Sequence, residues 1–394
     1  MKRVLFLIGN LNSGGAERSL VNLLQLINYD MYSVDLIAFK ERGPLLNEIP
    51  DKVNIIHDVD VLHYLYNDSI KDALKTYNIK LLYAHLFGTI ISKIITPSGM
   101  QKEQYRWKKY YSKLIPQLEN PYDIAISYME GSTTYYLIDK VVSKRKICWV
   151  HTDYNKVHTN LEFDNRYFDN ADSVVTISDS NARILEDLFP NIKKKLCVLP
   201  NLSNSNTIKL KSKEFIPNEY DFSVANIISI GRLVPSKAME RVVYASDVLK
   251  NKGIQFKWWI VGDGELKEKL ENLISEKELK NYVQLLGLKS NPYPYIVNAD
   301  VIVQTSQFEG KSIVLDEAKI LGVPIVSTNY DTVYDQVNSK EGIIVEMNAS
   351  SIAEGIITVL ENRDKYIDYL KSREYGNQSA IKDYYRVFEG IGNE

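Results

Sequence analysis

A carboxylate pair near one predicted helix suits a ligand that is part phosphate and part polyol. Glu309 lies in a loop after the predicted strand Val301–Gln304, and Glu317 lies inside the helix that follows. Carboxylates accept hydrogen bonds from vicinal hydroxyl groups, and the amides at a helix start attract anions. A solvated, charged helix start is the alternative. The residues that would hold the ligand are Glu309, Gly310, Lys311, Ser312, Ile313 and Glu317.

Two basic residues follow another predicted strand, Asn226–Ile230. Arg232 and Lys237 are five positions apart in one loop. A planar guanidinium and a compact ammonium group can hold a diphosphate from two directions. Ordinary surface charges are the alternative interpretation of this loop.

A glycine pair, Gly14 and Gly15, follows the first predicted strand, Val4–Ile8, and opens a helix. Glycine lets backbone amides approach an anion closely at such a turn. The spacing differs from the G-x-G-x-x-G fingerprint of dinucleotide sites, and Phe39-Lys40 stands where an acidic residue is expected. A nicotinamide-dependent dehydrogenase is therefore disfavoured, and a tight turn without a ligand remains the alternative.

His151 comes directly after the predicted strand Lys146–Val150. An imidazole at that position can donate to a substrate hydroxyl or orient it, although a packing role is equally compatible. Glu130 follows the predicted strand Ile124–Tyr128 and is a candidate contact for a second substrate. An Asp-x-Asp motif occurs at Asp58–Asp60, after a short predicted strand. No other candidate metal ligand supports this motif, so we expect no metal site.

Composition excludes several classes of protein. Lys plus Arg number 48 and Asp plus Glu number 50, for a net charge of −2. That balance excludes a protein-wide nucleic-acid surface. No stretch reaches the ~18 apolar residues of a membrane span. The apolar run after Lys2-Arg3 is too short for a secretory signal, so we expect a cytoplasmic protein.

Short β-branched runs alternate with helical patterns almost from end to end, and the predicted strands include Lys80–Ala84. This alternation predicts doubly wound parallel sheets. The alternation lapses in an Asn-, Ser- and Lys-rich segment, residues 204–221. We therefore expect an α/β fold with two Rossmann-like domains, residues 1–203 and 222–365, that face a cleft. Residues 204–221 would be the linker, and a helical tail, residues 366–394, would pack back towards the first domain. The candidate residues above would lie at the carboxyl ends of strands, where such sheets bind ligands.

With these residues in view, the chain resembles the retaining glycosyltransferases of family 4, within the group 1 glycosyltransferases, which have the GT-B architecture. The resemblance covers essentially the whole chain. It is carried by Gly14-Gly15, by Arg232 and Lys237, by Val261–Gly264 and by the Glu309–Glu317 element. It implies transfer of a hexosyl or N-acetylhexosaminyl unit, with a UDP-sugar as the favoured donor, to a lipid-linked or polysaccharide acceptor in surface-glycan synthesis. It also implies that neither a cofactor nor a metal ion is required.

The resemblance implies a role for each matched residue. Arg232 and Lys237 would stabilise the leaving diphosphate, helped by the amides of Gly14 and Gly15. Glu309 would hold hydroxyls of the donor sugar. The remaining implied contacts are the nucleotide ribose for Glu317, the reacting face of the sugar for His151, and the base for Gly287 and Leu288.

Two positions depart from the usual pattern of that family. Ala238 stands where glycine is common, a change that we expect to matter little. Lys311-Ser312 stands where an aromatic or small apolar residue is frequent, which leaves the choice of donor open. A nucleotide-sugar epimerase and an inactive partner subunit on the same fold are the alternatives.

Residues 93–113 combine six basic residues and one acidic residue with interleaved aromatic side chains. Such a mixture favours contact with anionic lipid headgroups, here at the inner membrane surface. An aromatic face packed inward is the alternative. Candidate acceptor contacts are Tyr105, Trp107 and Glu130. The oligomeric state is open.

Overall fold

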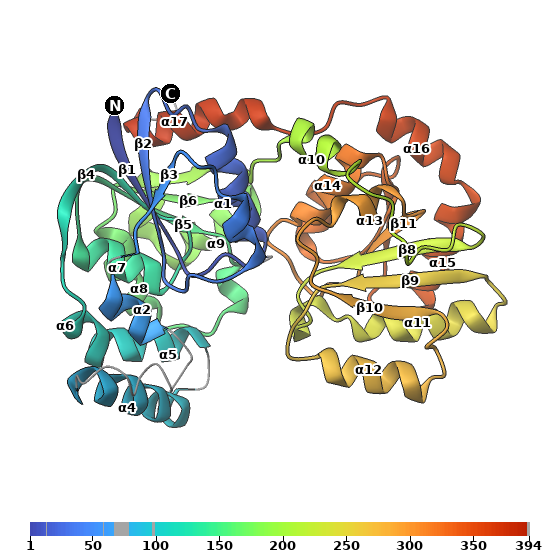
Figure 1. The fold of residues 1–394 in the computed structure, drawn as a ribbon, viewed down its shortest axis with the longest axis horizontal. Coiled ribbons are helices and arrows are strands. Elements are labelled where there is room, and N and C mark those ends of the chain that lie inside the picture. The colour runs from blue at the N-terminus through green and yellow to red at the C-terminus, as the bar shows by residue number, and fades with distance from the viewer. Residues whose placement is uncertain (13, 58, 67–78, 97–98, 392–394) are drawn as a thin grey trace. The chain divides into compact units, whose positions relative to one another are not determined.

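The computed structural model describes residues 1–12, 14–57, 59–66, 79–96 and 99–391. Its contacts divide the chain into two compact units (Figure 1). The first, here called the N-unit, contains residues 1–12, 16–201 and 379–394. The second, the C-unit, is built on residues 202–378.

The N-unit is organised around a parallel sheet, with seven strands among the described residues. Their order is β3-β2-β1-β4-β5-β6-β7, so the chain reverses its direction of travel across the sheet between β1 and β4. The strands are β1 (Lys2–Ile8), β2 (Tyr32–Ala38), β3 (Val53–Ile55), β4 (Leu118–Ser127), β5 (Val141–Val150), β6 (Ser173–Thr176) and β7 (Leu196–Val198).

Helices complete the N-unit, and the last of them comes from the C-terminus. In α17 (Ile381–Glu389), the Tyr384 ring stacks on Trp149 at 5.3 Å and the Phe388 ring packs edge-on to Phe6 at 6.2 Å. The other helices are α1 (Gly15–Leu26), α2 (Asp60–Tyr66), α4 (Ile79–Ile95), α5 (Gly99–Arg106), the π-helix η2 (Trp107–Tyr111), α6 (Ser112–Leu114), α7 (Ser132–Lys140), α8 (Leu161–Asp169) and α9 (Asp179–Leu188).

The C-unit has a second parallel sheet, of six strands in the order β10-β9-β8-β11-β12-β13 within the described residues. Its direction reverses between β8 and β11. The strands are β8 (Ala225–Ile230), β9 (Phe256–Val261), β10 (Val283–Gly287), β11 (Val301–Gln304), β12 (Ile325–Thr328) and β13 (Gly342–Val345). The helices are α10 (Ser205–Lys211), α11 (Glu240–Asn251), α12 (Lys267–Glu276), α13 (Tyr293–Val297), α14 (Ile313–Leu321), α15 (Ala349–Glu361) and α16 (Arg363–Lys371).

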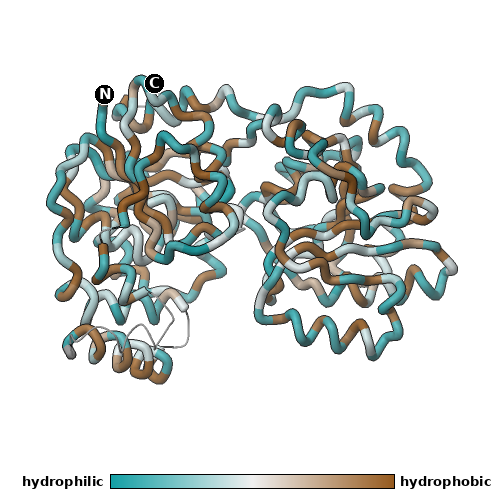
Figure 2. Tube along the Cα trace, viewed as in Figure 1, coloured by the Kyte–Doolittle hydropathy of each residue, from teal (hydrophilic) through white to brown (hydrophobic). Residues whose placement is uncertain are grey.

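Most strands coincide with apolar runs of the sequence, and Figure 2 shows this hydrophobic colour along the middle of each unit. β4 and β5 begin several residues before their apolar runs, in polar segments. Residues 4–8 of β1 and residues 256–261 of β9, apart from Lys257, are all buried. Burial on both faces is what parallel strands require. The predicted fold class, two doubly wound parallel-sheet domains, is confirmed.

Two details of the predicted organisation differ from the structure. Residues 80–84, predicted as a strand, form the first turns of helix α4. A short apolar run has the same appearance in a buried strand and in a helix. The expected linker also contains a helix, α10, which begins where the Asn204 side chain accepts a hydrogen bond from the Thr207 amide at 3.1 Å.

Candidate active site

Glycines hold together the loops at the carboxyl ends of β8, β9 and β10. The Gly231 amide donates to the Val261 carbonyl at 3.0 Å, and the Gly262 amide donates to the Gly287 carbonyl at 2.9 Å. A Cβ on Gly262 would lie only 1.9 Å from the Gly231 carbonyl oxygen, and its φ is 150°. Only glycine fits there. The glycine of the Val261–Gly264 motif therefore lets the β9 loop pack against the β8 loop.

The β8 loop presents Arg232 at this edge of the sheet. Its neighbour Leu233 is buried, and the Leu233 amide donates to the Asp263 carbonyl at 2.9 Å. Gly264, with φ of 159°, lies against the Leu233 backbone. With the backbone fixed on both sides, the Arg232 side chain is exposed to solvent.

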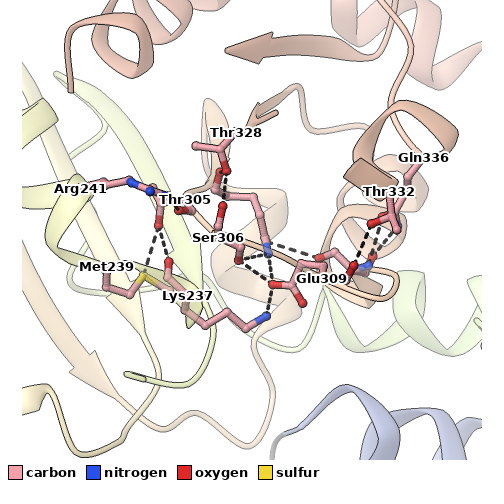
Figure 3. A network of polar contacts seen from close by, with 11 residues as sticks. Lys237, Met239, Arg241, Thr305, Ser306, Glu309, Thr328, Thr332 and Gln336 are labelled. Carbon is pink, nitrogen blue, oxygen red and sulfur yellow. Dashed lines mark hydrogen bonds and ion pairs between the residues drawn. The ribbon is translucent and has the colours of Figure 1, made fainter. Parts of the chain in front are cut away.

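Lys237 and Glu309 form an ion pair between the loops that follow β8 and β11 (Figure 3). Glu309 Oε1 also accepts hydrogen bonds from Gln304 Nε2 at 2.8 Å and from the Ser306 hydroxyl at 2.5 Å. The two ionic side chains are only 19% and 13% exposed. The pair lies at the switch point of the sheet, where doubly wound folds bind ligands.

Backbone contacts fix the two loops to each other. The Thr305 hydroxyl donates to the Lys237 carbonyl at 2.9 Å, and the Gln307 amide donates to the Ser236 carbonyl at 2.8 Å. Arg241 Nη1 donates to the Thr305 carbonyl at 2.7 Å. The spacing between Lys237 and Glu309 is thus set by several contacts besides their own ion pair (Figure 3).

Gln336 and Thr332 hold the start of α14 beside this pair. Gln336 Oε1 accepts from the Ser312 amide at 3.1 Å, and Gln336 Nε2 donates to the Ser312 carbonyl at 2.5 Å. The Thr332 hydroxyl donates to the Glu309 carbonyl at 2.9 Å. The Ser312 side chain makes no capping hydrogen bond to α14. The first-turn amides, which have no acceptor within the helix itself, are the groups that an anion would use.

Two other residues predicted in this unit, Glu317 and Lys311, have polar partners of their own. Glu317 is 3% exposed and accepts a hydrogen bond from the Tyr293 hydroxyl at 3.1 Å. Lys311 lies 3.6 Å from the Asp316 carboxylate. Leu288 is exposed beside Gly287, whose φ is 69°. Their contacts with ribose, donor and base stay predictions.

Ala238, next to Lys237, adopts a left-handed backbone conformation with φ of 47°. A Cβ is unfavourable in this region, whereas glycine has no such cost. The glycine usual in the resembled family therefore has a backbone reason here. The replacement by alanine places strain directly beside the catalytic candidate Lys237.

In the N-unit, Glu130 holds the turn that carries His151. Its carboxylate accepts from the His151 amide at 3.0 Å and from the Thr152 hydroxyl. Burial lowers the pKa of His151 to about 3, and a hydrogen bond to the Tyr128 backbone opposes that shift. The imidazole is therefore neutral. Its Nε2 atom is buried and has no hydrogen-bond partner within the described ranges.

An aromatic stack supports this histidine. Tyr128 lies 5.2 Å from the His151 ring and stacks on Trp149 at 4.8 Å. Its hydroxyl and that of Ser19 are 2.9 Å apart. Sequence reasoning missed Tyr128, Trp149 and Ser19. Tyr128 ends a predicted buried strand, which was the available signal.

Trp107 is not a surface residue, so its prediction as an acceptor or lipid contact is wrong. Its side chain is fully buried, and its indole N–H donates to Asp139 at 2.8 Å. Tyr111 is buried as well. The aromatic side chains of this segment partly serve the core, because η2 turns them inward. Tyr105 is partly exposed, and its role stays a prediction.

Three other features complete the description of the candidate residues. Gly14 precedes α1 and Gly15 begins it. Asp58 of the Asp-x-Asp spelling lies outside the described residues, and Asp60 begins α2. Within the part of the chain that the structure describes, no cluster of three His, Cys, Asp or Glu residues could hold a metal ion. In the same part, every helix is too short or too polar to cross a bilayer.

Residues 212–380 match the family model "Glycosyl transferases group 1". The match covers less than half of the chain and lies almost entirely in the C-unit. The matched segment contains Arg232, Lys237, Glu309 and Glu317, so the ion pair at the switch point lies within the family's own domain.

Relatives of this glycosyltransferase match over different shares of its length. An N-acetylgalactosamine-N,N'-diacetylbacillosaminyl-diphospho-undecaprenol 4-alpha-N-acetylgalactosaminyltransferase of Campylobacter jejuni is 28% identical over 383 residues, which is 95% of each chain. The uncharacterized glycosyltransferase MJ1059 of Methanocaldococcus jannaschii is 29% identical over 187 residues, 47% of this chain and 45% of that protein.

Solved structures share the fold. A mutant of TarM from S. aureus, crystallised with Fondaparinux, alpha-GlcNAc-glycerol and UDP, superposes with a TM-score of 0.67 over 98% of this chain and 100% of that one. The sequence identity is 14%. This likeness, together with the two parallel sheets, identifies the fold as GT-B.

Proposed function

We propose that this glycosyltransferase moves a hexosyl or N-acetylhexosaminyl unit from a UDP-sugar to a lipid-linked or polysaccharide acceptor in surface-glycan synthesis, with retention of the anomeric configuration. The observation that carries the proposal is the Lys237–Glu309 pair beside the start of α14, where Ser312 makes no capping hydrogen bond. The UDP in the TarM structure supports the donor class, and the diphospho-undecaprenol in the name of the Campylobacter relative supports the acceptor class.

The donor half of the reaction needs positive charge at the leaving diphosphate. The Lys237 ammonium group has three N–H donors, and one of them donates a hydrogen bond to Glu309. The other two remain to donate to a phosphate oxygen. Arg232 and the first-turn amides of α14 would supply the rest. Fixed dipoles and charges of this kind stabilise negative charge as it develops. The proposal assigns no step to a metal ion.

Glu309 would position the donor sugar. Three donors, from Lys237, Gln304 and Ser306, all bind Oε1. Oε2 is the oxygen that would accept hydrogen bonds from sugar hydroxyls. Because Oε1 is held from three sides, the direction of Oε2 is fixed before substrate binds. Such preorganisation is what a transfer site requires.

His151 would take a substrate hydroxyl as a hydrogen-bond acceptor. Its ring is neutral, and its bond to the Tyr128 backbone uses one ring nitrogen as a donor. The other nitrogen, Nε2, then carries no proton and can accept. This role replaces the donation that sequence reasoning also allowed.

A donor and acceptor assay tests the proposal. The protein is incubated with a panel of nucleotide sugars, with and without a membrane extract that contains lipid-linked glycans, and UDP release is measured. We expect release that depends on the acceptor. Conversion of the donor without any acceptor would instead identify an epimerase. A β-linked product from an α-linked donor would contradict retention, and activity lost in EDTA and restored by Mg²⁺ would contradict the metal-free mechanism.

A further inference from the structure

Helix α4 exposes a continuous apolar stripe on the N-unit. Tyr83, Phe87, Ile90 and Ile94 are 49%, 46%, 54% and 78% exposed. Their spacings of four, three and four residues place them on one face of the helix. The other side of α4 is buried, as Leu81, Ala84 and Ser92 show. α4 is the helix labelled at the lower left of Figure 1, and Figure 2 shows its hydrophobic colour.

Contacts between aromatic rings hold the side chains of the stripe in place. The Tyr83 and Phe87 rings stack with centroids 4.4 Å apart and an interplanar angle of 24°. Tyr83 also packs edge-on to Tyr110 at 6.2 Å. Aromatic side chains held in this way lose little conformational entropy when they enter a new apolar environment. Single exposed apolar residues are ordinary, but a row of four on one helix face is a recognition surface.

Positive charge surrounds this stripe. Residues 79–115 contain seven basic residues and one acidic residue. The acidic one, Glu103, turns inward to the Ser132 hydroxyl at 2.9 Å, and burial raises the pKa of its carboxyl group. Lys80 and Lys93 are exposed, and helix geometry places them on opposite sides of the stripe. Lys108 and Lys109 are exposed on η2, which packs against α4.

We propose that α4 lies flat on an anionic lipid bilayer, with its apolar stripe among the upper acyl chains and the surrounding lysines on lipid phosphates. An apolar helix face flanked by basic residues is typical of interfacial helices. Charge decides between possible occupants. A second copy of this surface would bring positive charges together, whereas an anionic bilayer neutralises them. The inference rests on the proposed function only in that a lipid-linked acceptor would lie at the same surface.

Vesicle co-sedimentation of the full chain tests the proposal. The vesicles contain phosphatidylglycerol and phosphatidylcholine in one arm and phosphatidylcholine alone in the other. We expect binding to the anionic vesicles. The stripe variant Phe87→Ser/Ile90→Ser/Ile94→Ser should weaken this binding by roughly tenfold or more. The reason is that serine removes the apolar surface that the three wild-type side chains would bury in the bilayer. The matched control is Leu210→Ser/Ile216→Ser/Phe222→Ser, three exposed apolar residues of the C-unit, which should bind as the wild type does.

A charge variant keeps the test decisive if the stripe variant folds poorly. Lys93→Glu/Lys108→Glu/Lys109→Glu should weaken binding to anionic vesicles by roughly tenfold or more. Lys209→Glu/Lys213→Glu/Lys267→Glu, all exposed in the C-unit, is its control. Unchanged binding by both α4 variants, or no wild-type binding, would overturn the proposal. So would a dimer in light scattering that the stripe variant dissociates. UDP affinity, measured by calorimetry without lipid, tests the donor site separately and should be equal in all variants.

Discussion

The two units place different chemistry at the carboxyl ends of similar sheets. In the C-unit, Lys237 and Glu309 form an ion pair beside a helix start, and Arg232 lies nearby on the same edge. In the N-unit, the corresponding edge presents a neutral histidine on an aromatic stack. The ion pair of the C-unit suits a charged ligand, and the neutral histidine of the N-unit suits a hydroxyl group.

The difference has a simple electrostatic cause. The Lys237–Glu309 pair keeps some exposure and has additional hydrogen bonds, so its charges remain compensated. Burial favours the uncharged form of His151, and the hydrogen bond to the Tyr128 backbone only partly opposes this effect. In a two-substrate transfer, a diphosphate donor needs fixed charge, and a hydroxyl group needs only a hydrogen-bond partner. The contrast therefore agrees with the proposed reaction.

The largest effect should follow from removing the carboxylate of the charged site. Glu309→Ala leaves the Lys237 ammonium without its ionic partner and the sugar hydroxyls without an acceptor. We expect kcat to fall by roughly 100- to 1,000-fold, the usual cost of losing one preorganised polar group, with a much smaller change in UDP affinity. Steady-state kinetics and calorimetry measure the two quantities.

Glu346, an exposed carboxylate after β13, provides the control. Glu346→Ala should retain wild-type kcat. Glu309→Gln keeps the shape and removes the charge, so its kcat should lie between those of the wild type and Glu309→Ala. A Glu309→Ala enzyme with full turnover would remove Glu309 from the proposed mechanism.

Lys237 and Arg232 allow a comparison within the C-unit. Lys237→Met should lower kcat/KM by roughly 100-fold and Arg232→Met by roughly tenfold, since a partly buried charge is less screened than an exposed one. Lys267→Met, at the start of α12, is the matched exposed control. If Arg232→Met proves the more damaging change, the diphosphate lies nearer to the β8 turn than we propose.

Much of the C-unit site was predictable from the sequence. Lys237 and Glu309 each follow an apolar strand, and the carboxyl ends of parallel strands meet at one edge. Gln304, Ser306 and Gln336 were missed. Gln304–Gln307 is a polar run that begins at the last residue of a buried strand, which was a usable signal. Gln336 lies 24 residues beyond Ser312, and only the fold brings the two together.

The N-unit was harder to predict because local pattern and tertiary packing disagree there. The sequence around Trp107 mixes basic and aromatic residues, as an exposed surface segment does. In the structure, however, a π-helix turns Trp107 and Tyr111 into the core. The short apolar run at the start of α4 has the sequence pattern of a buried strand. The exposed stripe of α4 could not be recognised while its first turns were assigned to a sheet.

Acid should destabilise the protein through His151. The pKa of its ring is about 3 in the folded protein and near 6.5 in the unfolded chain. Between these values only the unfolded chain binds the proton, so stability is lost as pH falls from 6.5 towards 3. The contribution is roughly 1 kcal/mol per pH unit. His151→Gln should flatten that part of the curve, measured by urea unfolding at several pH values.

A wild-type slope that His151→Gln does not change would mean that the imidazole is charged in the folded protein. The contrast between a neutral histidine and a charged ion pair would then fail.

The smallest effect concerns the backbone beside Lys237. Ala238→Gly removes a Cβ from a residue with φ of 47°. The relief of about 1–2 kcal/mol is partly offset by the greater freedom of glycine in the unfolded chain. We expect a gain of roughly 0.5–1 kcal/mol in the free energy of unfolding. Ala182→Gly, inside α9 of the N-unit, should instead cost roughly 1 kcal/mol.

A loss of stability in Ala238→Gly would show that the Cβ contributes packing around Lys237 that outweighs the strain. Unchanged stability but reduced kcat would show that the strained turn helps to position the Lys237 ammonium group.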